Sequence, residues 1–151
     1  MFEIRDWLYI AGFPEASSNK LVRAQGIEAM LQLFEEFKSE AVISHFIPVN
    51  DGVPMTNAMI REGVDFIRKQ HDAGHKLLIT CGAGISRSVT FSIIALKEIE
   101  GLSLSDAYRA IHDVHPKALP DHVHWQAVAD YYGEPNDFWR IWGNILMGDD
   151  E

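Results

Sequence analysis

The sequence predicts an α/β fold, in which helices cover both faces of a central, mostly parallel sheet of four to five strands. Three observations support this prediction. Short β-rich segments alternate with helical segments over the first hundred residues, and helical patterns fill the rest of the chain. In addition, the segment KLLITC at 76–81 is short and largely apolar, as expected of a strand buried in the middle of a parallel sheet.

The first strand and the first helix are predicted near the N-terminus. The segment DWLYIAG at 6–12 predicts a strand that ends at Gly12, and Pro14 is expected in the loop after it. The segment SSNKLVRAQG at 17–26 starts with serines that can cap a helix and ends near a glycine, so it predicts a short helix.

Two further strands and a longer helix are predicted before the central strand. The strands are expected at 27–34 and 41–49, and the segment NDGVP at 50–54 has strong turn chemistry. A helix is expected next, over about 56–72, and Thr56 can cap its first turn. Its apolar side chains share one face at helical spacing: Ile60, Val64 and Ile67.

The rest of the chain predicts helices only, at 88–101, 103–116 and 120–133. A last helix is expected in the tail at 136–148, with one stripe formed by Phe138, Ile141, Trp142 and Ile145. A stripe at this spacing indicates packing onto the domain, with a partner or a second subunit as the alternative. We therefore expect one domain over residues 1–151, with 134–151 as a C-terminal helical extension.

Composition and charge narrow the range of functions. The chain carries 13 Lys and Arg against 22 Asp and Glu, a formal net charge of −9. Such a surface repels nucleic acids and anionic membranes, because both bind through cationic side chains. No apolar run is long enough to span a membrane, and the N-terminus does not resemble a signal peptide. With a single Cys, we expect a reducing, cytoplasmic location. A monomer is expected by default.

The loop after the central strand has the composition of an anion-binding site. Cys81 ends the strand and Arg87 lies six positions later; between them lie Gly82, Ala83, Gly84, Ile85 and Ser86. Glycines allow a short loop to curl until its backbone N–H groups converge on an anion. The N-terminus of the next helix adds to this field, and the planar guanidinium of Arg87 matches two oxygens of a phosphate.

The same field favours the thiolate form of Cys81, because amides, a helix N-terminus and a cation all stabilise negative charge on sulfur. A thiolate at the bottom of a phosphate-binding loop is placed for in-line attack on phosphorus. Ser88 can donate a hydrogen bond to the sulfur as it leaves in a second step, or it can simply cap the helix. A buried structural thiol is the alternative for Cys81, but it explains neither the glycines nor the Arg.

The segment CGAGISRS is similar to the C-x5-R-[ST] signature of the cysteine-dependent protein phosphatases, and it resembles the dual-specificity branch of that family. Further similarity lies in DWLYIAGFPEA, in GIEAMLQL and in HPKALPDHVHWQ, which includes Gln126. About residues 4 to 130 fit the family. The resemblance implies a protein-phosphatase-like arrangement of the sheet and helices.

The resemblance also implies a general acid on a separate loop upstream. Asp51 lies thirty positions before Cys81, just after a predicted strand, and this context matches the acid of the family. The chemistry itself requires a proton donor, because an alkoxide is a very poor leaving group. An ordinary turn aspartate is the alternative for Asp51.

The chain departs from the family at Thr80, where the family usually has His. A Thr hydroxyl can form a hydrogen bond but brings no positive charge. We therefore expect the thiolate of Cys81 to be less stabilised than in a relative that has the His.

No metal or organic cofactor is expected. Clustered histidines suggest a metal site at first, but zinc sites usually add Cys or carboxylates at tight spacing. Solvated or hydrogen-bonded side chains are expected instead for His112, His115, His122 and His124.

These residues predict a phosphatase that hydrolyses phosphoprotein monoesters through a cysteinyl-phosphate intermediate. Cys81 attacks, residues 82–87 hold the phosphoryl group, Asp51 acts as acid and then base, and Ser88 assists the second step. The small, uncharged loop side chains and the net charge of −9 favour a protein phosphomonoester or a small aryl phosphate over polyphosphorylated lipids or RNA ends. The chain shows no obvious extra loop to deepen the cleft, so we expect phosphotyrosine together with phosphoserine and phosphothreonine. The alternative is a phosphoresidue-binding module without turnover. A sulfurtransferase is disfavoured because its loop is usually one residue shorter.

Overall fold

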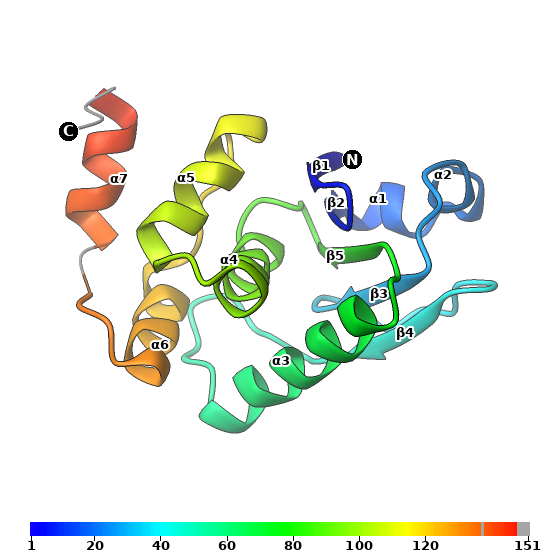
Figure 1. Ribbon diagram of the computed structural model, residues 1–151, viewed down its shortest axis with the longest axis horizontal. Coiled ribbons are helices and arrows are strands. Elements are labelled where there is room, and N and C mark those ends of the chain that lie inside the picture. Colours follow the sequence, from blue (N-terminus) through cyan, green and yellow to red (C-terminus); the bar gives the residue numbers. More distant parts are fainter. Residues whose placement is uncertain (137, 148–151) are drawn as a thin grey trace.

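A computed structural model describes residues 1–136 and 138–147, which form five strands and seven helices (Figure 1). The strands make one sheet in the order β1-β2-β5-β3-β4. Only the pair of β1 and β2 is antiparallel within these residues. The strands are β1 (Phe2–Arg5), β2 (Leu8–Gly12), β3 (Ala29–Gln32), β4 (Ile43–Phe46) and β5 (Leu77–Cys81). The predicted α/β fold class is confirmed.

Strand β5 lies in the centre of the sheet and is buried along its whole length. It pairs with β2 on one side and with β3 on the other, and both pairs are parallel. Gly12 of β2 is level with Cys81, and Gln32 of β3 is level with Thr80. The carboxyl ends of all three strands therefore meet beside Cys81, at the edge where sheets of this kind bind ligands.

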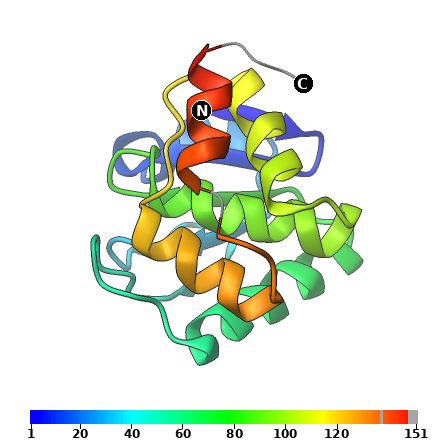
Figure 2. The same cartoon turned by 90° about the vertical axis from the view of Figure 1, so that its left-hand side faces the viewer.

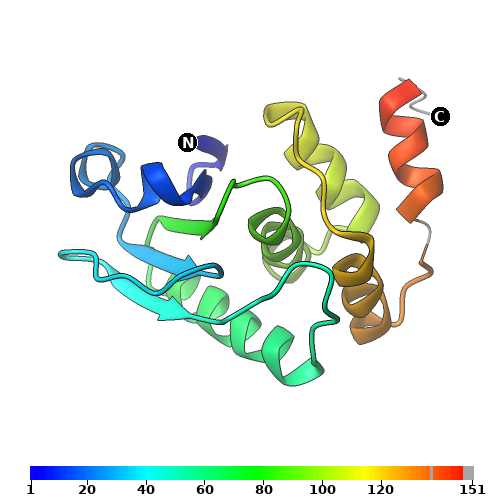
Figure 3. The ribbon, with the colours of Figure 1, turned by 180° about the vertical axis from the view of Figure 1, so that it is seen from behind.

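Helices cover both faces of the sheet (Figures 1 and 3). On one face, α1 and α2 enclose a small core that includes Tyr9, Val22 and Leu78. On the other face, α3, α4 and α5 contact the strands, and α6 packs on α3 and α4. These helices are α1 (Phe13–Ala16), α2 (Asn19–Ala24), α3 (Asn57–Asp72), α4 (Arg87–Glu100), α5 (Leu104–Val114) and α6 (His122–Tyr132). Among the described residues, no helix combines the length and the apolar character needed to cross a bilayer.

Local signals set most helix boundaries. The Thr56 side chain accepts a hydrogen bond from the Met59 N–H at 3.1 Å, so the predicted cap of α3 is confirmed. Gly101 ends α4 in the left-handed conformation, with φ of 73°, which a residue with a side chain adopts less readily. Pro14 lies not in a loop, as the sequence predicts, but in the first turn of α1, where its missing N–H costs no helical hydrogen bond.

The last described helix, α7 (Phe138–Met147), lies at one end of the molecule, beyond α5 and α6 (Figures 1 and 2). Phe138 and Ile141 are buried in the core, and Trp142 and Ile145 pack against it. The predicted packing of this stripe onto the domain is confirmed. Residues 137 and 148–151 of the expected extension lie outside the described residues.

Candidate active site

The loop between β5 and α4, residues 82–86, is curled so that three of its carbonyl groups are held from outside the loop. The donors come from three separate segments of the chain. The bonds join the Phe13 N–H to the Gly82 carbonyl (2.9 Å), the His115 Nε2 to the Gly84 carbonyl (2.8 Å) and the Leu119 N–H to the Ile85 carbonyl (2.9 Å).

The amide groups of the loop consequently face inward. In a trans peptide the N–H points opposite to the C=O, so the N–H groups of residues 83, 85 and 86 point away from the three held carbonyls. Within the described part of the chain, the N–H groups of residues 82–86 donate to no protein acceptor. A set of unpaired N–H groups in a curled loop forms an anion-binding nest.

Two glycines allow this loop to lie directly on the end of β2. Gly84 has φ of 75°, and a Cβ at this position would lie 2.7 Å from the Gly12 nitrogen. A Cβ on Gly12 would in turn lie 3.0 Å from the Gly82 carbonyl oxygen. Any side chain at either position would push the loop away from the strand, which explains why both are glycine.

Cys81 lies at the base of the loop and faces Ser88. Its Sγ is 3.2 Å from the Ser88 Oγ, and both side chains are buried. The thiol donates to the hydroxyl in the neutral form; when the sulfur is a thiolate, the hydroxyl becomes the donor. Helix α4 begins at Arg87 with Ser86 as its N-cap residue, so the alternative in which Ser88 caps the helix is wrong.

Arg87 turns its guanidinium toward the same region. Its Nη1 donates to the Val49 carbonyl at 2.9 Å, and its Nε lies 3.3 Å from the Asp51 Oδ1. The group also lies over the Phe34 ring, with its Cζ 5.1 Å from the ring centroid. The Arg87 side chain is only 12% exposed. These contacts hold the fork of donors in one orientation before a phosphate binds.

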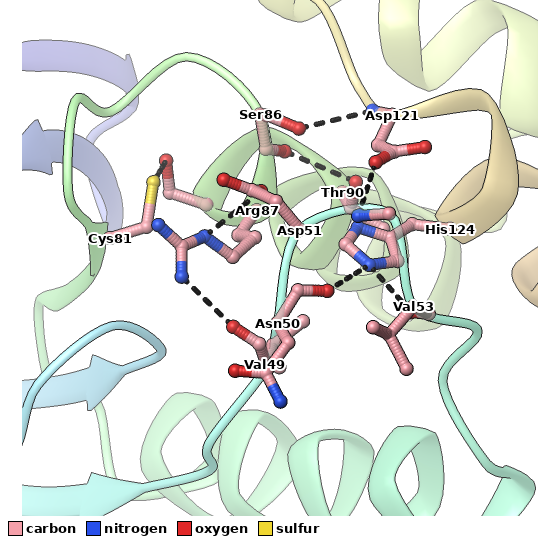
Figure 4. Close-up of polar contacts among 12 residues, drawn as sticks. Val49, Asn50, Asp51, Val53, Cys81, Ser86, Arg87, Thr90, Asp121 and His124 are labelled. Atoms are coloured by element: carbon pink, nitrogen blue, oxygen red, sulfur yellow. Dashed lines mark hydrogen bonds and ion pairs between the residues drawn. The ribbon is translucent and has the colours of Figure 1, made fainter.

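Asp51 lies on the loop between β4 and α3, and its side chain is 65% exposed. In Figure 4 the side chains of Cys81, Arg87 and Asp51 converge on one region in front of the loop. The loop carrying Asp51 thus brings a carboxylate to the Arg87 guanidinium, although thirty positions separate Asp51 from Cys81. A phosphate held by Arg87 would lie within reach of this carboxylate.

Asp121, the N-cap residue of α6, joins the loop that carries Asp51 to the loop of residues 82–86, which we call the phosphate loop. Its carboxylate accepts hydrogen bonds at 2.8 Å from the N–H groups of Gly52 and Val123, and its own N–H donates to the Ser86 Oγ at 3.1 Å. Burial opposes the charged form, but the bonds from Val123 and Gly52 and the nearby His124 and His122 outweigh it. Together they hold the pKa of Asp121 below its ordinary value.

His124, one turn further along α6, holds the Asp51 loop from its other side. Its Nε2 lies 3.0 Å from both the Asn50 and the Val53 carbonyl oxygens. Figure 4 draws both contacts as dashed lines. Because carbonyls only accept, the Nε2 of this ring carries a proton. The Nδ1 is buried and has no hydrogen-bond partner among the described residues.

Thr80, which stands where the family usually has His, does not contact the sulfur through its hydroxyl. The hydroxyl donates instead to the Cys81 carbonyl oxygen at 3.3 Å, and the side chain is buried. The residue therefore stabilises the end of β5 rather than the thiolate.

Four residues of the site are not assigned to it by the sequence. Hydrogen-bonded or solvated side chains are expected for His115 and His124, and both are in fact buried and bonded to the two site loops. No sequence pattern assigns Asp121 and Phe34 to the site, because each contacts a site residue that lies far from it in the sequence: Gly52 for Asp121 and Arg87 for Phe34. Among the described residues, no group of three or more His, Cys, Asp or Glu side chains is arranged to hold a metal ion.

Comparison with known proteins agrees with this geometry. Residues 8–134 match the family described as the dual specificity phosphatase, catalytic domain. The rat dual specificity protein phosphatase 12 is 29% identical over 133 residues, which are 82% of this chain and 39% of the relative. The chain spans well under half the length of the curated relatives it matches.

Solved structures show the same fold. Human DUSP28 matches with a TM-score of 0.81 at 19% identity, covering 88% of this chain and 96% of the other. PTPMT1, solved in complex with PI(5)P, matches with a TM-score of 0.75 at 18% identity, covering 94% of this chain and 96% of the other. The resemblance seen in the sequence is confirmed: this chain belongs to the dual specificity phosphatase catalytic-domain family.

Proposed function

We propose that this chain is an active phosphoprotein phosphatase that hydrolyses phosphotyrosine, and with it phosphoserine and phosphothreonine, through a cysteinyl-phosphate intermediate. One observation supports this above the others. The N–H groups of residues 83, 85 and 86 point away from the three held carbonyls, and the Cys81 Sγ lies at the base of the same loop, 3.2 Å from the Ser88 Oγ. The Arg87 guanidinium lies beside Gly82 of this loop. A loop that only bound phosphate would have no use for a nucleophile at this point.

In the first step, the Cys81 thiolate attacks phosphorus in line with the leaving oxygen, and an S–P bond forms as the O–P bond breaks. The loop amides and Arg87 hold the three other phosphoryl oxygens, whose charge is stabilised through the transition state. Asp51 donates its proton to the leaving oxygen, so that an alcohol or phenol departs instead of an alkoxide.

In the second step, Asp51 accepts a proton from water, and the water oxygen attacks phosphorus as the S–P bond breaks. The sulfur leaves as a thiolate. Ser88, whose Oγ lies 3.2 Å from the sulfur, donates a hydrogen bond to the charge that develops there. The products are inorganic phosphate and the regenerated enzyme.

The residues of the loop favour a phosphoprotein over a phosphorylated lipid as the substrate. Residues 82–85 are Gly, Ala, Gly and Ile, so Arg87 is the one cation of the loop sequence. A substrate with several phosphates would leave its additional charges without a cationic partner there. Although the structurally similar PTPMT1 was solved with PI(5)P, that similarity at 18% identity concerns the fold.

The decisive experiment measures 4-nitrophenyl phosphate hydrolysis against pH for the wild type, Cys81→Ser and Asp51→Asn. We expect the wild type to release phosphate and Cys81→Ser to be inactive. Asp51→Asn should have a kcat about 100-fold or more lower than the wild type, and its pH profile should lack the basic limb. Tight binding of a phosphotyrosine peptide by a wild type that releases no phosphate would show a binding module instead.

A further inference from the structure

An apolar groove of about 760 Å³ begins at the rim of the phosphate loop. Its inner end is formed by Ile85 and Ser86 of that loop and by Asp51. Asp51 lies on the loop between β4 and α3, which we call the acid loop. Leu119 and Trp139 form part of its walls, and both are exposed although they are large and apolar. A groove of this volume, lined mainly by apolar side chains with a few polar groups, has the usual form of a ligand-binding site.

Helix α7 supplies the outer wall of the groove. The Trp139 ring lies 5.7 Å from the His122 ring of α6 and 5.9 Å from the Trp142 ring, measured between centroids. Phe138 beneath them is buried against Trp125, with ring centroids 5.5 Å apart, and anchors the helix. Trp139 itself remains 64% exposed. The family match ends at residue 134, so this wall lies outside the matched residues.

The groove is continuous with the place where the phosphorylated side chain must enter. A substrate bound to Cys81 and Arg87 leaves the loop past Asp51, which protonates the leaving oxygen. The atoms just beyond that oxygen therefore pass the inner end of the groove, where Asp51, Ile85 and Ser86 lie. The part of the substrate next to its phosphorylated residue therefore faces a groove that α7 also lines with aromatic side chains.

The charges of the groove decide between a peptide and a membrane lipid. Asp51 and Asp121 line it, and among the described residues that line it none is Lys or Arg. The whole chain carries a formal net charge of −9. An anionic lipid surface is repelled by such a wall, whereas a neutral or basic peptide is not.

We infer that this groove is a specificity subsite that binds a large apolar or aromatic side chain next to the phosphorylated residue of a peptide substrate. The inference rests on the proposed phosphatase function and assigns Trp139 as a specificity-determining residue. Burying such a side chain against Trp139 and Leu119 removes apolar surface from water and strengthens peptide binding.

The test uses paired phosphotyrosine peptides that carry Phe or Ala beside the phosphotyrosine. For the wild type, we expect kcat/KM to be about tenfold higher with Phe, mainly through KM. Trp139→Ala should abolish this preference, and Trp139→Phe should keep most of it. The preference is the ratio of the two kcat/KM values measured with the same variant, so a general effect of Trp139→Ala on activity cancels from it. The control is Ile43→Ala, at an apolar residue of β4 that is 50% exposed and does not line the groove.

The possible negative results separate failure of the proposed phosphatase function from failure of the subsite. A wild type that does not hydrolyse 4-nitrophenyl phosphate refutes the proposed function itself. An active wild type without the Phe preference, or one whose preference survives Trp139→Ala, overturns the subsite alone. Turnover of a phosphoinositide in micelles that falls with Trp139→Ala, without any peptide preference, overturns the peptide as occupant. A wild-type dimer that Trp139→Ala converts to a monomer shows that a second copy covers the groove, which also overturns it.

Discussion

At the scale of single residues, two hydroxyl groups near the reactive sulfur have different roles. The Ser88 Oγ lies 3.2 Å from the Cys81 Sγ, so it can stabilise negative charge there directly. The Thr80 hydroxyl donates instead to the Cys81 carbonyl oxygen. Side chains of successive residues along a strand point to opposite faces of the sheet, which is why Thr80 and the Cys81 sulfur are separated. Of the two hydroxyl groups, only that of Ser88 is therefore placed to act on the sulfur during the proposed reaction.

Replacing Ser88 with Ala should slow the second step more than the first. The departing sulfur would lose one donor to a charged group, so kcat should fall by about 10- to 100-fold. Rapid mixing with 4-nitrophenyl phosphate should then show a burst of nitrophenol as cysteinyl phosphate accumulates. Ser92→Ala is the control, because the Ser92 hydroxyl is also buried in α4 but donates to the Ser88 carbonyl. An equally large burst in Ser92→Ala would argue against a specific role of Ser88.

Replacing Thr80 with His should restore the residue that the family usually has at this position. A positive charge beside the loop favours the thiolate, so the acidic limb of the kcat/KM profile should move to lower pH. Thr80→Val, which removes only the hydroxyl, should leave the limb in place. The profile is measured with 4-nitrophenyl phosphate. If the limb of Thr80→His coincides with that of the wild type, the residue does not control the thiolate.

At the scale of elements, the first turn of α6 positions the acid loop. Asp121 accepts from the Gly52 N–H, and His124 donates to the carbonyls of Asn50 and Val53, so both sides of Asp51 are held. Asp51 itself is mostly exposed, so solvent weakens its ion pair with the largely buried Arg87. The hydrogen bonds from α6, and not the ion pair, should determine where the carboxylate lies.

We expect His124→Ala to displace Asp51 and to impair catalysis unequally for different leaving groups. Proton donation matters most for a poor leaving group, so the rate with phenyl phosphate should fall about tenfold more than the rate with 4-nitrophenyl phosphate. His124→Gln, which keeps an N–H donor, should recover part of the loss. His112→Ala on α5 serves as the control. Equal losses on both substrates would indicate general destabilisation and not a positioning role.

Helix α3 packs so closely on α4 that one position excludes any side chain. A Cβ at Gly63 would lie 2.3 Å from the Phe91 ring, which is fully buried. Gly63→Ala should therefore lower the free energy of unfolding by about 1 to 3 kcal/mol, despite the better helix propensity of Ala. Gly143→Ala in α7 is the matched control, because its Cβ meets no described atom within 4 Å. It should instead raise that free energy by about 0.5 to 1 kcal/mol in urea titrations. Equal effects of both variants would contradict the packing argument.

At the scale of the whole molecule, the site is assembled from segments that lie far apart in the sequence. The phosphate loop is held by the N–H of Phe13, the ring of His115 and the N–H of Leu119. The His115 ring is itself stacked on Phe2 of β1, with ring centroids 3.9 Å apart. The loop therefore has its shape only when both ends of the domain have folded around it, so the site and the global fold should be lost together.

The link through Asp121 should make stability depend on pH in a defined window. The pKa of Asp121 is lowered in the folded state, so its charged form stabilises the fold above the ordinary pKa of Asp. This contribution is lost as pH falls through the lowered pKa. At pH 6, Asp121→Asn should reduce the free energy of unfolding by about 2 kcal/mol, because the neutral amide lacks the charge and keeps only one of the two acceptor oxygens. The difference from the wild type should shrink below about pH 4 in urea titrations. A difference that does not change down to pH 3 would show that the charge of Asp121 is not responsible.

Much of the fold can be predicted from local patterns. The helical spacing of the apolar residues predicts α3. Thr56 marks the start of α3 by capping it, and Gly101 marks the end of α4 by its left-handed conformation. Both signals depend only on residues nearby in the sequence. Strand β1 is not predicted, although its residues FEIR alternate between apolar and polar, because four residues are too few for this pattern to identify a strand, and pairing with β2 holds it at the sheet edge.

The sequence by itself determined the chemistry that the phosphate loop can offer. Cys81, the glycines and Arg87 lie within seven consecutive positions, so their spacing and their place after an apolar strand can be read directly. Tertiary structure alone decided that the loop carbonyls face outward, that His124 holds the acid loop, and that α7 adds an aromatic wall beside it. The physical reason is that these contacts join residues tens of positions apart, and no local period or turn preference specifies which distant partner a buried donor will find.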